Sequence, residues 1–430
     1  MDNFRSAQFF IHEDNPFFTI LIQQLHFSKN LYNSSLYTLR QAFFKGSTIS
    51  YEDLEKQMKV KLSNCSDLQG YDYYQMATAQ SAQQTIKRAS WSFSSFLKSK
   101  KKYEKNPKYY TGKPCLPKYL RGKYYIVTLT NQNCKVKGNM VIFPKTYQDF
   151  SLDISNLFMN EEYTFDSLRE VRFFLKNATI IMEVVYKIKP IKQYKLRKDR
   201  ICGIDPGVTN FLACSFNFFK HPIIFDGSYL KSVNQYYNKK IAYYTSKAKK
   251  YNNVYETKRI RALWEKRHRK IKAYMHKVSH HLIQLCLKSK VSKIVIGHVK
   301  GWKKKNKHKQ NFAYIPFTMI RKMIEYKANF YGIKVIYVNE RYTSGTSFLD
   351  GELPQKKYYK KNRRVKRGLV ITDKNVAINA DVNAGYQMIR QYEMIKNKEN
   401  RQVGKASISC YKVSTKWKNI ASRVERLYIA

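Results

Sequence analysis

Acidic residues are scarce in this chain of 430 residues, which has 30 Asp and Glu against 81 Lys and Arg and a formal net charge of +51 at pH 7. A protein with so large an excess of one sign repels itself unless a polyanion neutralises it. Aromatic residues make up 15% of the chain and alternate with lysines, as in proteins that stack bases and contact phosphates. The composition therefore predicts a nucleic-acid partner, and any acid at the end of an apolar strand becomes a candidate functional group.

Cysteine pairs and long apolar runs are also missing. The seven cysteines include no CxxC motif, which excludes a zinc ribbon or knuckle, and their irregular spacing favours reduced thiols. No apolar run reaches the roughly 18 residues of a membrane-spanning helix, and the first residues lack the pattern of a signal peptide. We expect no membrane partner, and a cytoplasmic, nucleoid-associated location in a bacterial host or a nuclear one in a eukaryotic or viral context.

In the N-terminal half, the spacing of apolar residues predicts helices followed by strands. Residues 15–100 space their apolar side chains at three and four positions, which indicates amphipathic helices. A basic linker at 98–119 contains three prolines and cannot be a regular helix. From about 123 to 188 the apolar period changes to two, which predicts a small antiparallel sheet or barrel.

The C-terminal half predicts a mixed α/β domain. Short apolar strands are expected at 201–205, 211–216, 222–225, 293–299 and 333–338, and helices at about 230–290, 317–331 and 379–392. A ribonuclease-H-like nuclease domain has this succession of elements: three strands, a helix, a strand, a helix, a strand and a helix. The last 35 or so residues are polar and weakly patterned, so we expect a flexible basic tail there.

Three acids stand where such a domain would need them. Asp205 ends an apolar strand, Glu340 follows the strand IKVIYV, and Asp381 begins a helix in NADVNAG. Hydrolysis of a phosphodiester with two divalent ions requires several carboxylates that converge on one point. Taken singly, each acid has an ordinary alternative as a turn residue, a surface acid or a helix N-terminal acid.

Four segments, read in order, carry a resemblance to one family. GIDPGVTNFLA (203–213), KIVIGHV (293–299), MIEYKANFYGIKVIYVNERYTSGTSFLDGE (323–352) and NADVNAGYQMI (379–389) are similar to the split RuvC motifs of TnpB, the transposon-encoded RNA-guided DNA nucleases related to type V CRISPR effectors and Fanzors. The resemblance covers most of the chain. It implies a mixed α/β multidomain fold with a ribonuclease-H-like (RuvC) nuclease domain, an antiparallel β wedge domain and a helical recognition domain.

Two departures from the family pattern matter. The strand KIVIGHV lacks the glutamate that many members carry near its end, and we interpret Glu340 as its replacement, with Gly297 leaving room for the carboxylate on the neighbouring strand. The zinc-binding CxxC pairs before the last motif are also missing, and a run with eight basic residues among twelve, KKYYKKNRRVKR, stands in that region. We expect no zinc, and we expect that run to become ordered on nucleic acid. Nearby Asp350 and Glu352 are either turn residues or supporting acids.

The resemblance implies the following domains: a β wedge domain at 1–14 and 105–195, a helical recognition domain at 15–104, the nuclease domain at 196–340 and 379–395, a target-nucleic-acid-binding insertion without zinc at 341–378, and the tail at 396–430. The cations expected to contact nucleic acid are Lys101, Lys102, Lys108, Lys303, Lys304, Arg363, Arg364, Lys366 and Arg367.

The resemblance also implies a function. The chain is expected to bind a guide RNA derived from the transposon end and to cleave matched double-stranded DNA beside a short flanking motif, as a monomer within a ribonucleoprotein. Asp205, Glu340 and Asp381 would hold two Mg²⁺ ions, for which Mn²⁺ can substitute. Two alternatives stay open: an RNA-guided DNA-binding repressor without cleavage, and a DNA-joining transposase that uses an acid triad without RNA.

Overall fold

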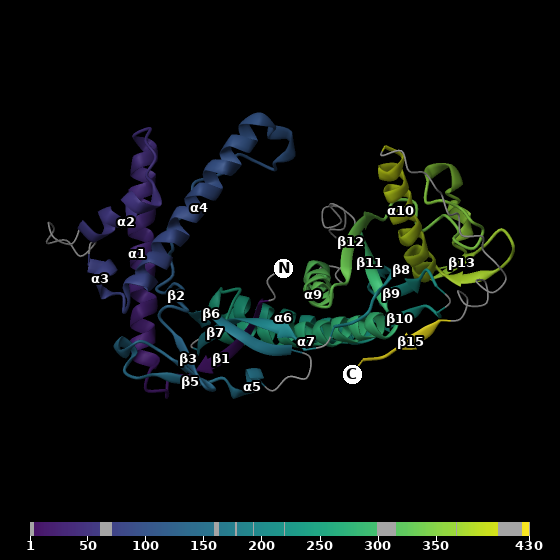
Figure 1. The fold of residues 1–430 in the computed structure, drawn as a ribbon. Helices are drawn as coiled ribbons and strands as arrows, with labels where there is room; N and C mark the ends of the chain where they lie inside the picture. Colours follow the sequence, from purple (N-terminus) through teal and green to yellow (C-terminus); the bar gives the residue numbers. More distant parts are fainter. Residues whose placement is uncertain are drawn as a thin grey trace. The chain divides into compact units, whose positions relative to one another are not determined.

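The structure, a computed structural model, describes residues 4–60, 71–158, 163–176, 179–191, 193–218, 220–298, 315–366, 368–402 and 424–429 (Figure 1). The chain divides into two compact units, Met1–Lys192 and Gln193–Ala430. None of the helices in these ranges is long and apolar enough to cross a membrane.

The first unit contains a pair of long helices, α1 (Phe18–Phe44) and α4 (Ala79–Lys105). Each buries one apolar side, and Phe43 of α1 meets Phe93 and Phe96 of α4 at ring-centroid distances of 5.9 and 5.8 Å. Thr78 caps α4, since its side chain accepts a hydrogen bond from the Ser81 amide at 3.1 Å. The shorter helical elements are α2 (Tyr51–Val60), α3 (Tyr71–Gln75), α5 (Ser155–Phe158), η1 (Pro107–Tyr109) and η2 (Lys145–Tyr147).

Two antiparallel sheets complete the first unit. The larger has the strand order β1-β7-β6-β2, and the smaller has the order β3-β4-β5. The antiparallel sheet predicted over 123–188 is therefore confirmed, and the N-terminal residues add a strand to it by pairing β1 with β7. The strands are β1 (Phe4–Ile11), β2 (Val127–Thr130), β3 (Lys135–Lys137), β4 (Met140–Ile142), β5 (Ser151–Asp153), β6 (Tyr163–Lys176) and β7 (Thr179–Pro190).

The second unit is built on a six-stranded sheet of order β12-β11-β8-β9-β10-β15. Strand β9 runs antiparallel to β8 and β10, whereas β11 runs parallel to β8 and β12. The strands are β8 (Arg197–Pro206), β9 (Asn210–Phe216), β10 (Ile223–Asp226), β11 (Val291–His298), β12 (Lys334–Asn339) and β15 (Glu425–Leu427). Its helices are α6 (Ser228–Asn252), α7 (Lys258–Lys288), α9 (Phe317–Phe330) and α10 (Ala380–Gln402).

The two faces of this sheet are covered by different helices. Because side chains alternate along a strand, Cys202 and Ile204 of β8 join the core formed with α6, α7 and α9, while Ile201 joins a cluster with residues of α10. Figure 1 shows α10 beside β8 and β11. Gly203 lies opposite α10, where a Cβ atom would come within 2.2 Å of the Gly385 carbonyl oxygen. The α10 face therefore has no room for a side chain at this point, and helix and strand backbones approach closely.

The basic helical region predicted over 230–290 is two helices rather than one. Asn253 adopts a left-handed backbone conformation (φ 47°) that ends α6, a conformation that asparagine tolerates better than most residues. Thr257 then caps α7 by accepting a hydrogen bond from the Ile260 amide at 3.3 Å.

The end of the chain is more structured than the sequence predicts. We expected a flexible tail over 396–430, but α10 continues to Gln402 and β15 pairs in parallel with β10. Leu427 of β15 packs against the core of the unit. A three-residue strand is too short to show an apolar period, which is why the prediction missed it. Residues 403–423 of the tail lie outside the described residues.

Gly203→Ala should destabilise the protein by about 1–3 kcal/mol, because its methyl group would force β8 and α10 apart. Gly112→Ala is the matched control, since a Cβ atom there meets nothing within 4 Å and surface changes stay within about 0.5 kcal/mol. Urea unfolding of both purified variants measures the difference. Equal unfolding midpoints would contradict the close packing of β8 on α10.

Candidate active site

The three predicted carboxylates lie on the α10 side of the sheet. Asp205 has the same parity on β8 as Ile201 and Gly203, which both face α10. Asp381 is in the first turn of α10. A Cβ atom at Gly207, in the turn after Asp205, would lie 3.9 Å from Asp381 Oδ2. The turn after β8 and the start of α10 therefore meet at this edge.

The side chain of Glu340 lies at this edge of the sheet, beside Gly297. It follows β12, whose neighbour β11 pairs Gly297 with Val338. A Cβ atom at Gly297 would come within 2.6 Å of both Cγ and Oε1 of Glu340 and within 2.5 Å of Met388 Cε. The prediction that Gly297 leaves room for the Glu340 side chain is confirmed. Any other residue at this position would compete with Glu340 for the same space.

The electrostatics of the three acids reflect burial and mutual repulsion. Burial raises the pKa of Asp205 well above its ordinary value, and the charges of Asp381 and Glu340 raise it further, while the Arg364 charge opposes the shift. Burial also raises the pKa of Glu340, and the Arg321 charge of α9 opposes that rise. Proximity of like charges is costly unless a cation joins them, so this edge of the sheet is suited to positive ligands.

Polar residues that the sequence analysis missed hold Asp381 in place. Asn210 donates a hydrogen bond from Nδ2 to Asp381 Oδ2 at 2.7 Å. Asn379 caps α10, since its Oδ1 accepts hydrogen bonds from the amides of Asp381 at 3.0 Å and Val382 at 3.2 Å. The asparagine before a helical pattern was a readable signal for Asn379, whereas nothing local marks Asn210.

The C-terminal strand supports this arrangement through Arg426. Its Nη1 donates to Asn210 Oδ1 at 3.2 Å and to Asp226 Oδ2 at 3.2 Å. The first contact fixes which end of the Asn210 amide is the acceptor and turns the Nδ2 group toward Asp381. Strand β15 is thus linked to a site carboxylate by two successive hydrogen bonds.

The chemistry of the three side chains fits Mg²⁺, which prefers hard oxygen ligands and keeps several of its waters. The raised pKa of Asp205, caused in part by the other two acids, is a second sign that a cation would be accommodated here. Within the described residues, however, no three Asp, Glu, His or Cys side chains are grouped as a ready-made cage for an ion. The three acids share an edge without closing around one point.

Comparisons with known proteins find two family models that match parts of the chain. A family model described as OrfB_IS605, probable transposase, matches residues 183–303, and one described as Cas12f1-like, TNB domain, matches residues 317–388. Over these two stretches the chain is similar to OrfB_IS605 and Cas12f1-like proteins.

One solved structure has a similar fold. The structure described as a Cas12f1–sgRNA–target DNA complex matches with a TM-score of 0.57 at 18% identity, over 86% of this chain and 82% of that one. A CRISPR–Cas12f ternary complex matches over 86% and 80% at 18% identity, with a TM-score of 0.39. No curated protein matched significantly. The similarity to the first structure supports a mixed α/β multidomain fold.

The cations predicted to contact nucleic acid lie in different environments. Lys101 and Lys102 on α4, Lys108 in η1, and Arg364 and Lys366 in the insertion are exposed. Arg364 also acts electrostatically on Asp205, so it lies near the carboxylates. Lys303, Lys304 and Arg367 lie outside the described residues.

Arg363 differs from the prediction, because its side chain is only 2% exposed and is paired within the protein. It donates to Glu352, with Nη2–Oε1 at 2.9 Å, and to Asp373 Oδ1 at 2.8 Å. Asp350 is part of the same cluster, since its Oδ2 accepts from the Asp373 amide at 2.9 Å. These acids are therefore partners of Arg363 rather than supporting acids of the carboxylate site.

The Arg363 cluster joins the parts of the insertion. It connects η5 (Lys361–Arg363) to the loop after β12. It also connects η5 to the loop between β13 (Leu369–Ile371) and β14 (Ala377–Asn379). The short helix η4 (Lys356–Tyr358) precedes η5 in the chain. A bidentate arginine held by carboxylates fixes several chain segments at once. This ionic cluster therefore crosslinks separate segments of residues 341–378, a region whose sequence has no CxxC pair.

Arg363→Met should destabilise the protein by about 3–5 kcal/mol, because it leaves Glu352 and Asp350 largely buried without their partner. The matched control is Lys360→Met. Lys360 pairs with the same Asp373 at 2.7 Å but both side chains are about half exposed, so the cost should stay below about 1 kcal/mol. Hydrogen exchange of residues 341–378 and urea unfolding measure both effects. Equal costs for the two variants would contradict the crosslink.

Asp205→Asn should stabilise the protein at neutral pH in EDTA. The folded-state pKa of Asp205 is raised above the ordinary value of 3.8, so stability falls as pH rises from about 4 through the raised pKa. The gain in stability is therefore expected to be larger at pH 8 than at pH 5.

The control for this pH dependence is Asp199→Asn. Its carboxylate is exposed, and a hydrogen bond from Arg197 lowers its pKa, so its removal should give no gain. Thermal unfolding at both pH values compares the variants. If Asp205→Asn lowers the unfolding temperature at pH 8, the three acids do not repel one another as described.

Proposed function

We propose that this chain is an RNA-guided DNA endonuclease of the TnpB type that cleaves matched double-stranded DNA by Mg²⁺-dependent hydrolysis. The observation that carries the proposal is the meeting of Asp205, Glu340 and Asp381, from three separate elements, at one edge of the sheet. The succession β8–β9–β10, helices, β11, α9, β12, α10 supports it, because it follows the order expected of a ribonuclease-H-like domain.

The partners are proposed from charge and from similarity. A net charge of +51 requires a polyanion of considerable length, and the similar solved structure is described as a complex with a guide RNA and target DNA. We propose a transposon-derived guide RNA, whose pairing with the target supplies sequence specificity, while the protein reads the flanking motif and holds the strands by their backbones.

The roles of the chain's own residues follow from their positions. Asp205, Glu340 and Asp381 would hold two Mg²⁺ ions, which supply an activated water and stabilise the leaving oxygen when bound. Asn210 keeps Asp381 oriented by its hydrogen bond. Gly297 keeps the space beside β11 free for the Glu340 side chain.

Glu340→Gln should reduce the cleavage rate at least about 100-fold while matched DNA is still bound, because a charged oxygen ligand is lost without a change in volume. Gly297→Ala should reduce it less, since its methyl group displaces the flexible ends of Glu340 and Met388. The measurement uses the full chain purified with its RNA, a DNA target matched to that RNA after sequencing, and Mg²⁺.

The matched control is Glu325→Gln, a carboxylate of α9 that accepts a hydrogen bond from the Tyr337 hydroxyl at 3.1 Å. It should leave cleavage unchanged. If the unmodified protein binds matched DNA but never cuts it, the RNA-guided repressor is the correct function. That alternative is favoured by one observation, namely that the described acids are not grouped as a finished metal cage.

A further inference from the structure

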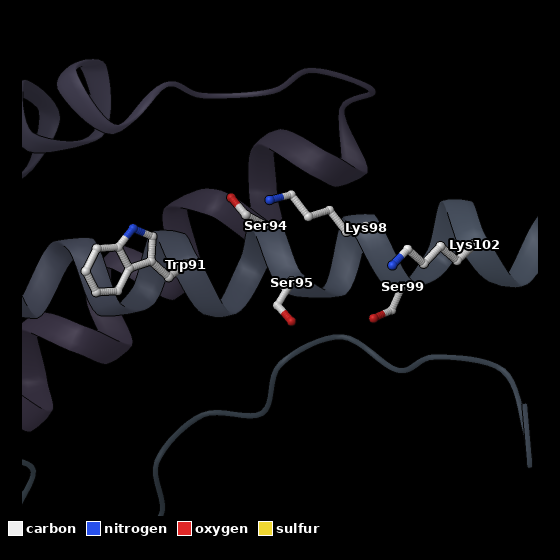
Figure 2. Close-up of a pocket in the computed structure, with 6 residues that line it drawn as sticks. All are labelled: Trp91, Ser94, Ser95, Lys98, Ser99 and Lys102. Atoms are coloured by element: carbon white, nitrogen blue, oxygen red, sulfur yellow. The ribbon is translucent and has the colours of Figure 1, made fainter. Parts of the chain in front are cut away.

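A hollow of about 400 Å³ lies along one side of α4 in the first unit (Figure 2). It is lined by Trp91, Ser94, Ser95, Lys98, Ser99 and Lys102. These residues are spaced at three and four positions and so form one stripe on the helix. The opposite side of α4 carries Phe93 and Phe96, which are buried against Phe43 of α1. The stripe is therefore the solvent-facing side of α4, whose other side packs against α1.

The aromatic and cationic residues of this stripe are available for a ligand. Trp91 is 63% exposed, which is unusual for so large an apolar side chain that has no packing role. Among the described residues, no carboxylate forms an ion pair with Lys98 or Lys102, whereas Lys100 on the other side of α4 pairs with Glu104 at 3.9 Å. Helix α4 has seven Lys and Arg and a single Glu, so its field attracts an anion.

The stripe combines the two features by which proteins hold unpaired polynucleotide strands. An exposed ring stacks on a base, and cations placed along the same groove follow the backbone. Lys98 and Lys102 are four residues apart, or about 6 Å along the helix axis. The small side chains of Ser94, Ser95 and Ser99 leave the helix surface open between ring and cations (Figure 2), so a sugar–phosphate backbone can approach it closely.

The serines favour RNA over DNA. Their hydroxyl groups can donate to and accept from a ribose 2′-hydroxyl, the group that distinguishes the two polymers. We propose that this stripe binds an unpaired stretch of the RNA partner, with a base on Trp91, phosphates on Lys98 and Lys102, and riboses on the serines. This inference rests on the proposed function only in that an RNA is the partner.

The test measures the binding of a fluorescein-labelled 12-nucleotide oligouridylate to the full chain by anisotropy at several salt concentrations. Trp91→Ala should weaken binding about 5- to 150-fold, corresponding to 1–3 kcal/mol per stacked base, and Trp91→Phe should restore most of it. The double variant Lys98→Ala/Lys102→Ala should reduce the slope of log affinity against log salt by about 1.4, or 0.7 per phosphate contact on a single strand.

The control is Lys100→Ala, which removes one positive charge from the other side of α4. It should leave stacking on Trp91 unaffected and should reduce the salt slope by less than half as much as the double variant does. Because the stripe is exposed, all variants should keep the unfolding temperature of the unmodified protein. The same variants are then measured with the corresponding oligodeoxyuridylate, on which Ser94→Ala/Ser95→Ala/Ser99→Ala should have a smaller effect than on RNA.

Three outcomes would overturn the inference. The first is that Trp91→Ala binds RNA as tightly as Lys100→Ala does. The second is that the triple serine variant weakens DNA binding as much as RNA binding. The third is a change of oligomeric state in Trp91→Ala, measured by light scattering, which would make the stripe a contact between copies of the chain. If any of these outcomes is found while the protein still cleaves guided targets, the RNA-binding inference is wrong and the proposed function stands. Failure of cleavage with intact effects at Trp91 overturns only the proposed function.

Discussion

The contact between the backbones of β8 and α10 is the constraint on which the candidate site depends. Gly203 and Gly385 face each other with no side chain between them, since a Cβ atom on either would clash. This contact brings the start of α10, with Asp381, to the edge at which β8 ends with Asp205 and Pro206. The parallel pairing of β11 with β8 and β12 then brings Glu340 to the same edge over Gly297. Three acids thus share one edge, where burial and then the charges of Asp381 and Glu340 raise the pKa of Asp205.

The sequence was sufficient for the parts that are encoded locally. Strand-end positions identified Asp205 and Glu340, and a helix start identified Asp381. The lack of a side chain at Gly297 explained how the side chain of Glu340, which follows the next strand, has room beside β11. Long periodic elements such as α4 and α9 were likewise predictable. What these patterns share is that each needs only a few neighbouring residues to be recognised.

The remaining features depend on partners that are distant in the chain. The composition of the run KKYYKKNRRVKR indicates uniformly solvated side chains. Of its basic residues that the structure describes, only Arg363 is buried, because it pairs with the distant Glu352 and Asp373. Asn210 and Arg426 are joined across 216 residues, and β15 is too short to show a period. Such hydrogen bonds leave no local signature, so the sequence could predict the acids but not the residues that hold them.

The central claim is that Asp205, Glu340 and Asp381 form one cation site despite the position of Glu340 on a neighbouring strand. The most direct measurement is a titration of the purified protein with Mn²⁺, followed by electron paramagnetic resonance of the free ion, for the unmodified chain and for Glu340→Gln. The account predicts two bound ions for the unmodified chain and a clear loss of binding for Glu340→Gln, comparable to that for Asp205→Asn. Unchanged Mn²⁺ binding in Glu340→Gln would contradict it.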